Sequence, residues 1–462
     1  MKSIYISVRN LHIGVMITIA LLLSSCEKYV DLDVSPDKLT VEDTYSTDAS
    51  ATSAVLALYS YYPTTYCVGY FSYLGGIYSD ELQYTGSTAE LMQFGQSSVS
   101  TTNSNNENYL WIYPFQVIRQ ANLTIAGVTN SATITTAAKN QLLGESKFFR
   151  AWLNFNMVNY LGDIPLAVNT SELENAYLPR STTEAVYTQI VNDLKDAQST
   201  LPEAYAGTAA MKLRVNKWAA TALLARTYLY QKDYANAEAQ ATQVISSGVY
   251  SMTALSNAFI NTSTETILQF STLYGASTFG GTYRTSAATL TPPTYVLQAD
   301  FMKSFETGDN RKTAWVDSIA YNGVKYYRIL KYKQNTATAT ATGNEYNVIL
   351  RLAEQYLIRA EARAQQGNIT GAQADLNVVR TRAGLAGTTA ASQPDLLTAI
   401  LNERKVELFG EYSQRWFDLK RTGKADAVMS ALRSTWKSTN VLMPIPYNQI
   451  LLNDKLTQNP GY

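Results

Sequence analysis

The pattern of apolar positions along the chain predicts a mainly α-helical protein. Apolar and small residues recur every three or four positions over several long segments, as expected for helices that bury one face. These segments are 49–62, 111–123, 137–160, 183–199, two that begin near Lys217 and Leu350, 394–409, and 415–421. Residues 63–108 are instead rich in Gly, Ser, Thr, Asn and Tyr without a long period, and we predict loops and short pieces there.

An internal repeat relates two of the helical segments. In each copy a helix with an apolar stripe is followed by a short turn, Lys232-Asp233 or Gly367-Asn368, and then by a second helix. The offset, 368 − 233 = 135, carries Ala237 onto the equivalent alanine of the second copy. Small residues at a helix crossing let two antiparallel helices approach closely, as in tetratricopeptide helix pairs.

Two further helix pairs and one irregular region complete the predicted organisation. The pairs are 137–160 with 183–199, and 394–409 with 415–421. Residues 248–349 contain Gly and Pro pairs, an Ala/Thr run, and alternating segments at 266–270 and 324–329. The predicted fold class is therefore mainly α, with tetratricopeptide-like helix pairs packed against an irregular, loop-rich region that contains few short strands.

The first 25 residues are typical of a secretory leader. Lys2 and Arg9 precede an apolar run from Ile13 to Leu23, which is too short to span a membrane. The run ends at Leu23-Ser24-Ser25-Cys26, which resembles a lipobox with Cys26 as the acylated residue. We therefore predict a lipoprotein signal peptide at 1–25, a lipidated tether at 26–48, and one domain over 49–462 that includes the insertion at about 248–349.

Cleavage of the leader would also exclude several kinds of catalytic and metal-binding site. His12 is the only histidine of the chain, and Cys67 would be the only cysteine besides the lipidated one. Without histidine no Ser-His-Asp triad, Cys-His pair or histidine metal site can form. We expect no catalytic residue, no metal and no cofactor.

The composition favours neutral ligands. Charged residues make up only 16% of the chain, the formal net charge is +0, and there are 33 tyrosines. Such a charge gives no electrostatic footprint for nucleic acid, whereas aromatic rings stack on the faces of sugars. From the loop-rich stretches we select the following candidate ligand-binding rings: Tyr70, Tyr73, Tyr274, Tyr283 and Trp315.

Four acidic residues are candidate functional groups. Glu403 and Glu407 lie four apart on one predicted helix and could act as the two carboxylates of a glycosidase. Neighbouring Arg404 and Arg415 favour buried ion pairs instead. Similarly, a turn before Pro165 accounts for Asp163 better than a metal does. Asp309 lies in a turn-like segment that lacks the ordered oxygen ligands of a calcium loop.

An ordered set of motifs follows the leader. They are Ser79-Asp80-Glu81; Trp111-Ile112-Tyr113 with Ala121-Asn122; Phe149-Arg150-Ala151 with 160–166; Asn216-Lys217-Trp218 with 224–226; 265–268; Arg351-Leu352-Ala353-Glu354; 359–362; 376–380; 403–408; 415–421; Pro444-Ile445-Pro446; and 458–462. In this order and behind a lipobox, the set resembles the SusD/RagB family of outer-membrane lipoproteins over essentially the whole mature chain.

The resemblance to this family implies a fold, a location, a ligand and a partner. It implies tetratricopeptide helices packed on a loop-rich half, lipid anchoring at the outer surface of the outer membrane, and capture of oligosaccharide for a SusC-like TonB-dependent transporter. It also leaves a peptide ligand open, as in RagB-like members. A surface glycoside hydrolase is the alternative from a different class.

Overall fold

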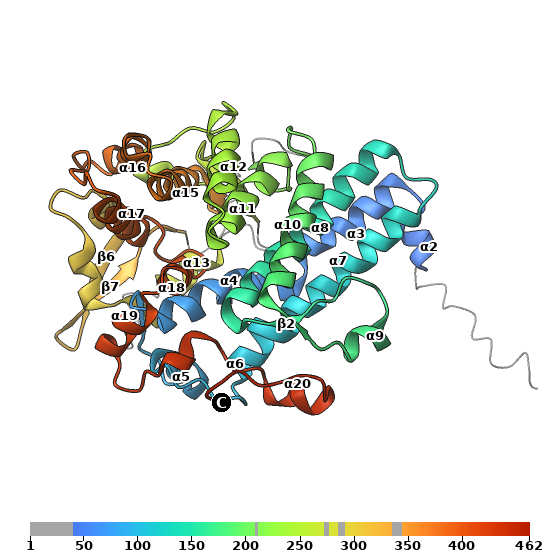
Figure 1. The fold of residues 1–462 in the computed structure, drawn as a ribbon, viewed down its shortest axis with the longest axis horizontal. Coiled ribbons are helices and arrows are strands. Elements are labelled where there is room, and N and C mark those ends of the chain that lie inside the picture. Colours follow the sequence, from blue (N-terminus) through green and yellow to red (C-terminus); the bar gives the residue numbers. More distant parts are fainter. Residues whose placement is uncertain (1–39, 208–210, 272–276, 285–291, 335–343) are drawn as a thin grey trace, which may run out of the picture.

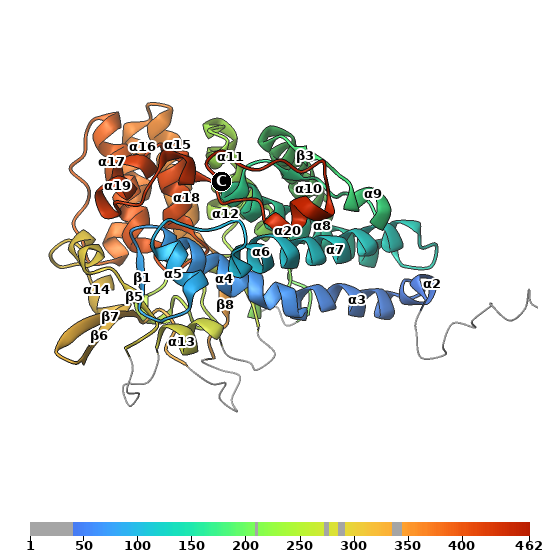
Figure 2. The same cartoon turned by 90° about the horizontal axis from the view of Figure 1, so that it is seen from below.

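The computed structural model describes residues 40–207, 211–271, 277–284, 292–334 and 344–462. Helices dominate this part of the chain, which confirms the predicted mainly α class (Figure 1). The helices stack along the long axis of the molecule, and most of the strands gather at one end beneath them (Figure 2).

Most of the longer helices follow the predicted segments, whereas α4 and α19 were not predicted. Their bounds are α3 Asp48–Ser60, α4 Tyr62–Tyr78, α7 Tyr113–Asn130, α8 Thr136–Leu161, α10 Thr183–Thr200, α11 Lys217–Tyr230, α12 Tyr234–Ser246, α15 Leu352–Gln365, α16 Ile369–Arg382, α17 Gln393–Glu407, α18 Gln414–Arg421 and α19 Ala425–Leu432. Among the described residues, no helix is both long and apolar enough to cross a membrane.

Shorter helical pieces connect them. These are α2 Val41–Thr44, α5 Ala89–Gly95, α6 Ser104–Glu107, the π-helix η1 Asn108–Ile112, α9 Glu172–Ala176, η3 Leu255–Asn257, α13 Thr278–Tyr283, η4 Ala299–Ser304, α14 Arg311–Ala314, η5 Ser438–Val441 and α20 Tyr447–Leu452.

The predicted internal repeat is confirmed in detail. Helices α11 and α15 begin at residues 217 and 352 and end at residues 230 and 365, so both bounds differ by 135. The turns match as well, because Lys232 and Gly367 both have a positive φ, 62° and 79°. At the next position Asp233 and Asn368 each cap the second helix by accepting a backbone N–H three residues later.

Small residues hold the paired helices together. In each copy the helices pack on one another, and α12 also packs on α15, so the two copies form one continuous stack. The alanines at the crossings are completely buried: Ala237, Ala241, Ala360, Ala364 and Ala372. Their short side chains allow the close approach that was predicted from the sequence.

Helix α4 corrects the prediction of loops and short pieces for residues 63–78, whereas residues 79–108 do form loops and short elements. From Cys67 to Tyr78 every residue except Tyr70 is buried, so this helix has no polar face and no amphipathic period that the sequence could reveal. Two glycines also suggested a break. However, a Cβ at Gly75 would collide with the side chain of Ser413, so the glycine serves close packing of α4 against the start of α18.

The irregular region supplies most of the strands. The strand bounds are β1 Leu82–Tyr84, β2 Ile164–Pro165, β3 Arg180–Ser181, β4 Thr266–Phe270, β5 Tyr295–Leu297, β6 Val316–Tyr321, β7 Val324–Ile329 and β8 Asn347–Arg351. They form an antiparallel sheet in the order β1-β5-β7-β6 and two ribbons, β2-β3 and β4-β8. The predicted strands at 266–270 and 324–329 are confirmed as β4 and β7. Asn322 and Gly323, both with positive φ, close the tight hairpin between β6 and β7.

Glu81, between α4 and β1, is buried, and no ionic partner contacts it among the described residues. Its Oε1 accepts the backbone N–H of Gly410 at 2.9 Å. Burial raises the pKa of Glu81 to about 7, although the bond from Gly410 opposes this shift. The side chain is therefore protonated in the folded protein at mildly acidic pH.

This raised pKa makes stability depend on pH in a defined direction. The unfolded chain ionises Glu81 near 4.5 and the folded chain only near 7, so this contribution is complete below 4.5 and is lost as pH rises through 7. Glu81→Gln cannot ionise. Relative to the wild type, its free energy of unfolding in urea should therefore improve by about 2 kcal/mol between pH 5 and pH 8. Glu184→Gln, on the exposed face of α10, is the control. An equal difference from wild type at both pH values for Glu81→Gln would contradict the assignment.

Candidate ligand-binding site

The structure places most of the selected aromatic rings in the interior. Tyr73, Tyr283 and Trp315 are 6%, 1% and 1% exposed, so a ligand cannot reach them in this conformation. The selection of these three rings as stacking residues is therefore corrected. Tyr70 is partly exposed, and Tyr274 lies outside the described residues.

The buried rings are held by partners of their own. The indole N–H of Trp315 donates to the carbonyl oxygen of Leu255 at 3.0 Å, and the ammonium of Lys331 lies 4.7 Å from the indole. Tyr73 donates its hydroxyl to Thr282 at 3.0 Å. A loop-rich sequence does not distinguish rings that fill space between loops from rings that face solvent, and this is why the selection failed.

Tyr70 belongs to a group of five partly exposed tyrosines, which we call the tyrosine face. Its members are Tyr66, Tyr70, Tyr84, Tyr109 and Tyr113. Helix α4 supplies the first two of them one turn apart, and β1, η1 and the start of α7 supply the others. Three segments that are separate along the chain, namely α4, β1 and the continuous stretch of η1 and α7, thus contribute the rings.

Four rings of the tyrosine face, those of Tyr66, Tyr70, Tyr109 and Tyr113, are in contact with one another. The ring centroids of Tyr70 and Tyr109 lie 3.4 Å apart with planes 9° from parallel, and Tyr66 lies 5.6 Å from Tyr109. Tyr113 lies 5.7 Å from Tyr66. Rings packed in this way keep little freedom to lose when a ligand binds, which favours a preformed site.

The second layer of the tyrosine face is buried. Tyr73 lies 5.7 Å from Tyr70 and stacks on Tyr295 at 5.1 Å, and Tyr295 in turn lies 5.6 Å from Tyr84. Tyr73 therefore lies beneath the rings that a ligand could touch and not among them.

The tyrosine face is neutral. Burial raises the pKa of Tyr109 well above its usual range, and the phenols of Tyr70, Tyr113 and Tyr66 raise it further. An un-ionised phenol both donates and accepts a hydrogen bond, while its ring offers an apolar surface. This combination suits a neutral ligand that carries hydroxyl or amide groups on an apolar framework.

Tyr109 and Tyr113 were missed at the sequence level because we treated the segment around Trp111 as structural. The sequence nevertheless indicates that their rings share one side of a helix, since the two tyrosines are four positions apart. The widened turn of η1 covers Asn108–Ile112, and π-turns often occur at functional sites. Tyr66 and Tyr84 were noted in a tyrosine-rich stretch but were not selected.

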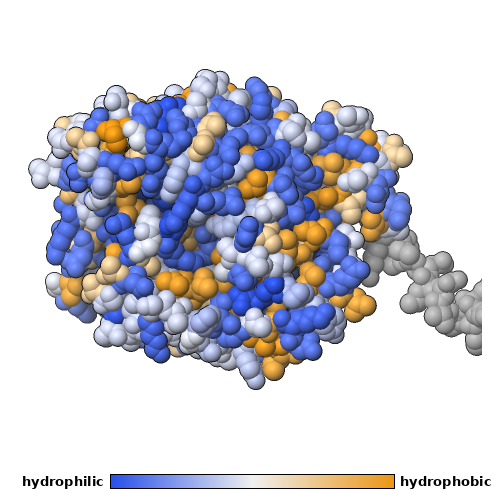
Figure 3. Space-filling view, viewed as in Figure 1, coloured by the Kyte–Doolittle hydropathy of each residue, from blue (hydrophilic) through white to orange (hydrophobic). Residues whose placement is uncertain are grey.

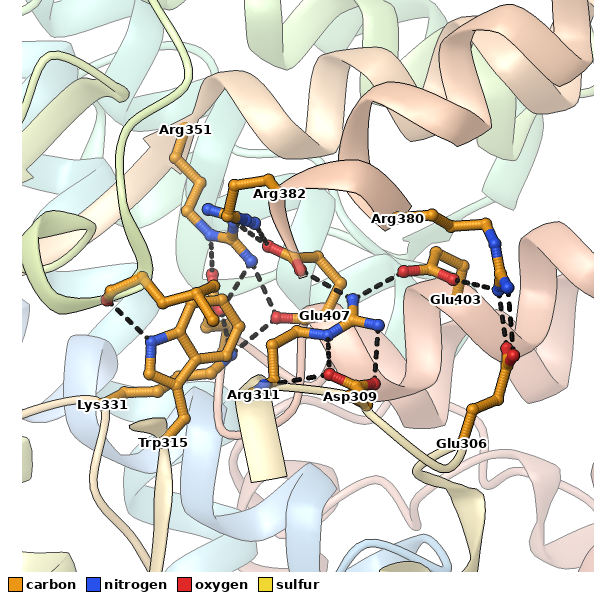
Figure 4. Close-up of polar contacts among 12 residues, drawn as sticks. Glu306, Asp309, Arg311, Trp315, Lys331, Arg351, Arg380, Arg382, Glu403 and Glu407 are labelled. Atoms are coloured by element: carbon orange, nitrogen blue, oxygen red, sulfur yellow. Dashed lines mark hydrogen bonds and ion pairs between the residues drawn. The ribbon is translucent and has the colours of Figure 1, made fainter. Parts of the chain in front are cut away.

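The candidate glycosidase carboxylates are structural. Glu403 and Glu407 are buried, and both face the guanidinium of Arg311 at 2.6 and 2.9 Å (Figure 4). The predicted ion pairs are confirmed, but their partners differ from those expected. Arg404 binds Asp418 at 2.7 Å, and Arg415 binds Asp80 at 2.7 Å.

Glu407 lies at the centre of a buried ionic network. Besides Arg311, it pairs with Arg351 at 2.5 Å and with Arg382. Burial alone would raise the pKa of Glu407, but the three guanidiniums hold it well below its usual range. A carboxylate held ionised by arginines and shielded from solvent cannot serve as a general acid.

The two other acidic candidates also have structural partners. Asp163 accepts the backbone N–H and the hydroxyl of Thr183 at 2.7 and 2.8 Å, which fixes the start of α10. The carboxylate of Asp309 binds Nε and Nη2 of Arg311 at 2.9 and 2.8 Å. No group of three or more potential metal ligands occurs in the part of the chain that the structure describes.

The arrangement defines a class of protein: a tetratricopeptide-like helical stack that carries an irregular half. Comparison with known families agrees with this class. Residues 31–229 match a family described as "Starch-binding associating with outer membrane", and residues 260–462 match the "SusD family". The chain belongs to the SusD/RagB family.

Individual relatives cover nearly the whole chain. "SusD-like protein P38" of Formosa agariphila is 25% identical over 98% of this chain and 99% of its own length. Among solved structures, a SusD superfamily protein from Bacteroides vulgatus matches with a TM-score of 0.78, at 18% identity, over 90% of this chain and 100% of that one. Surface glycan-binding protein A from Bacteroides fluxus matches with a TM-score of 0.75, at 22% identity and the same coverage.

The ionic network predicts that substitutions at its buried centre and at its exposed end change stability by unequal amounts. Glu407→Gln leaves three buried guanidiniums short of a counter-charge and should lower the free energy of unfolding by about 3–5 kcal/mol. Glu306→Gln alters the solvent-exposed end, where Glu306 pairs with Arg380 and is 56% exposed, and should cost at most about 1 kcal/mol. Urea unfolding of both variants tests this. Equal losses would show that the buried centre does not have the structural role assigned to it.

Proposed function

We propose that this protein is a lipid-anchored cell-surface protein that captures oligosaccharide and delivers it to a SusC-like TonB-dependent transporter, without cleaving it. Membership of the SusD/RagB family supports the class of function. One solved structure with the same fold is a laminarin binding SusD-like protein, at a TM-score of 0.74 and 24% identity. The pairing of Glu403 and Glu407 with arginine supports binding without cleavage, because these were the two carboxylates considered for hydrolysis.

The observation that carries the proposal is the tyrosine face. A neutral sugar offers no charge to a binding site, so affinity must come from apolar contact and hydrogen bonds to hydroxyl groups. The clustered rings provide the first and their phenols the second. The mutual packing of Tyr70 with Tyr109 holds both rings before a ligand arrives.

The decisive experiment is a glycan array probed with a soluble form in which Cys26 is replaced, with a set of oligopeptides on the same surface. Binding of glycans alone supports the proposal. Binding of peptides alone would assign the protein to the peptide-binding alternative. Incubation with any bound glycan should leave its chain length unchanged.

Ring substitutions should separate binding from stability. Tyr66→Ala and Tyr109→Ala should weaken glycan affinity about 10- to 100-fold, by analogy with the 1–3 kcal/mol that stacking on an aromatic side chain contributes. Tyr73→Ala, in the buried layer, should instead lower the free energy of unfolding by about 3–5 kcal/mol. Calorimetric titration and urea unfolding on each variant give both quantities. Tyr177→Ala, an exposed tyrosine that is not part of the tyrosine face, is the control for surface rings.

These results can contradict the site without removing the family. Unchanged affinity in folded Tyr66→Ala and Tyr109→Ala variants would place the ligand elsewhere on the molecule. The family assignment would stand, because it depends on matches over residues 31–229 and 260–462 and not on these rings.

Membrane attachment depends on Cys26 in this proposal. Cys26 lies outside the described residues, and its acylation remains a prediction from the lipobox. Cys26→Ala should move the protein from the membrane fraction to the soluble fraction, or leave the leader uncleaved. Fractionation with mass measurement of the amino terminus tests both outcomes, with Cys67→Ala as the matched control. Undiminished attachment of a processed Cys26→Ala variant would exclude lipid anchoring at this residue.

A further inference from the structure

A cavity of about 550 Å³ lies where the ends of α11 and α18 meet α15 and α17, and three lysines line it. Lys232 comes from the turn between α11 and α12, Lys420 from the end of α18, and Lys424 from the turn before α19. We call this cavity the lysine pocket. Figure 3 shows mainly hydrophilic residues over α12 and α15, the helices that border it.

The other charged groups around the lysine pocket neutralise one another. Glu361, the one acidic side chain among the residues described as lining it, accepts from Arg421 with both oxygens. Arg421 also pairs with Asp418 at 2.7 Å, and Asp418 pairs with Arg404 at 2.7 Å. These two guanidiniums and two carboxylates carry no net charge. The lysines that form ion pairs within the described structure are others, so the positive charge of the pocket has no counter-charge there.

Lys420 is the least exposed of the three lysines. It is partly buried, whereas Lys232 and Lys424 are exposed. Its ammonium donates to the carbonyl oxygen of Asn159 near the end of α8, and an ammonium has three N–H groups to donate. Desolvation lowers the pKa of Lys420 to about 7, and no carboxylate opposes the shift. A desolvated cation without a counter-charge is unfavourable, and a bound anion would supply that charge.

The rest of the lining indicates an organic anion of small size. The volume of the lysine pocket is typical of sites for small organic ligands and exceeds what an inorganic ion requires. Apolar and hydroxyl side chains also line it: Leu229, Tyr234, Leu397, Thr398, Leu401 and Thr422. An acidic sugar offers an oxyanion to the lysines, C–H groups to the apolar side chains and hydroxyls to the threonines. An ammonium acts as a point charge, so carboxylate and sulfate suit it equally.

We propose that the lysine pocket binds the carboxylate or sulfate group of an acidic sugar. This inference rests on the proposed function for the sugar, whereas the anion follows from the uncompensated charge of Lys232, Lys420 and Lys424. The pocket is a second site, because its lining comes from α11, α12, α15, α17 and α18, and the tyrosine face is built from α4, β1, η1 and α7. The neutral site and the charged site therefore select different parts of a ligand, or different ligands.

The test compares two triple variants of the full soluble chain by titration with glucuronate, glucose 6-sulfate, glucose and inorganic sulfate. The pocket variant combines Lys232→Gln, Lys420→Gln and Lys424→Gln. The control variant loses the same charge from exposed lysines on other elements and combines the following: Lys195→Gln, Lys312→Gln and Lys455→Gln.

We expect the wild type and the control variant to bind at least one charged sugar, and the pocket variant to bind it at least about 10-fold more weakly. Glucose should bind to none of them in the pocket. If the triple variant does not fold, Lys232→Gln with Lys424→Gln, both in exposed turns, should show a loss in the same direction.

The outcomes separate this inference from the proposed function. Equal losses in the pocket and control variants would show a general charge effect and overturn the site. Inorganic sulfate that binds as tightly as both charged sugars would make the pocket a site for an adventitious ion only. If the wild type binds glycans on the array but neither charged sugar, the inference fails and the proposed function stands. Binding of a charged sugar by a protein that binds no oligosaccharide on the array would support the pocket and overturn the proposed function.

Discussion

The burial of one carboxylate among three guanidiniums is the constraint on which much of the architecture depends. Glu407 from α17 must meet Arg311 from α14, Arg351 from the end of β8, and Arg382 from the end of α16. Desolvating these groups is costly, and only the complete set repays the cost. The network therefore permits one relative placement of the helical stack and the irregular half. Buried ion pairs, as well as packing, therefore position segments that lie up to about 100 residues apart in the sequence.

Single buried ion pairs join other helices of the stack. Arg150 with Asp193 joins α8 to α10, Arg226 with Glu354 joins α11 to α15, and Arg359 with Asp375 joins α15 to α16. Each pair is bidentate, so it fixes an orientation that the small, smooth alanine contacts leave free. On this rigid support α4 lies almost fully enclosed, and the rings at its open side keep their positions without help from a ligand.

Sequence reasoning succeeded where a local pattern has one structural meaning. The 135-residue repeat, its capped turns and the amphipathic helices could be predicted because each depends on neighbours in the sequence. It failed for α4, since a helix buried on nearly every side has no polar face to reveal its period. It also failed for Tyr73, Tyr283 and Trp315, because exposure depends on which distant segments cover a ring. The tyrosine face is assembled from three separate segments, and only Tyr70 was selected as one of its members.

The direct packing of α12 against α15 has a consequence for how the chain folds. Between the end of α12 at residue 246 and the start of α15 at residue 352 the chain leaves the stack for 351 − 246 = 105 residues and then returns to it. Joining these helices closes a loop of that length before any contact repays its entropy. An array of contiguous repeats can grow from neighbour to neighbour. This stack cannot grow in that way. During synthesis, the surface of α12 that packs on α15 stays exposed until about a hundred further residues have been added.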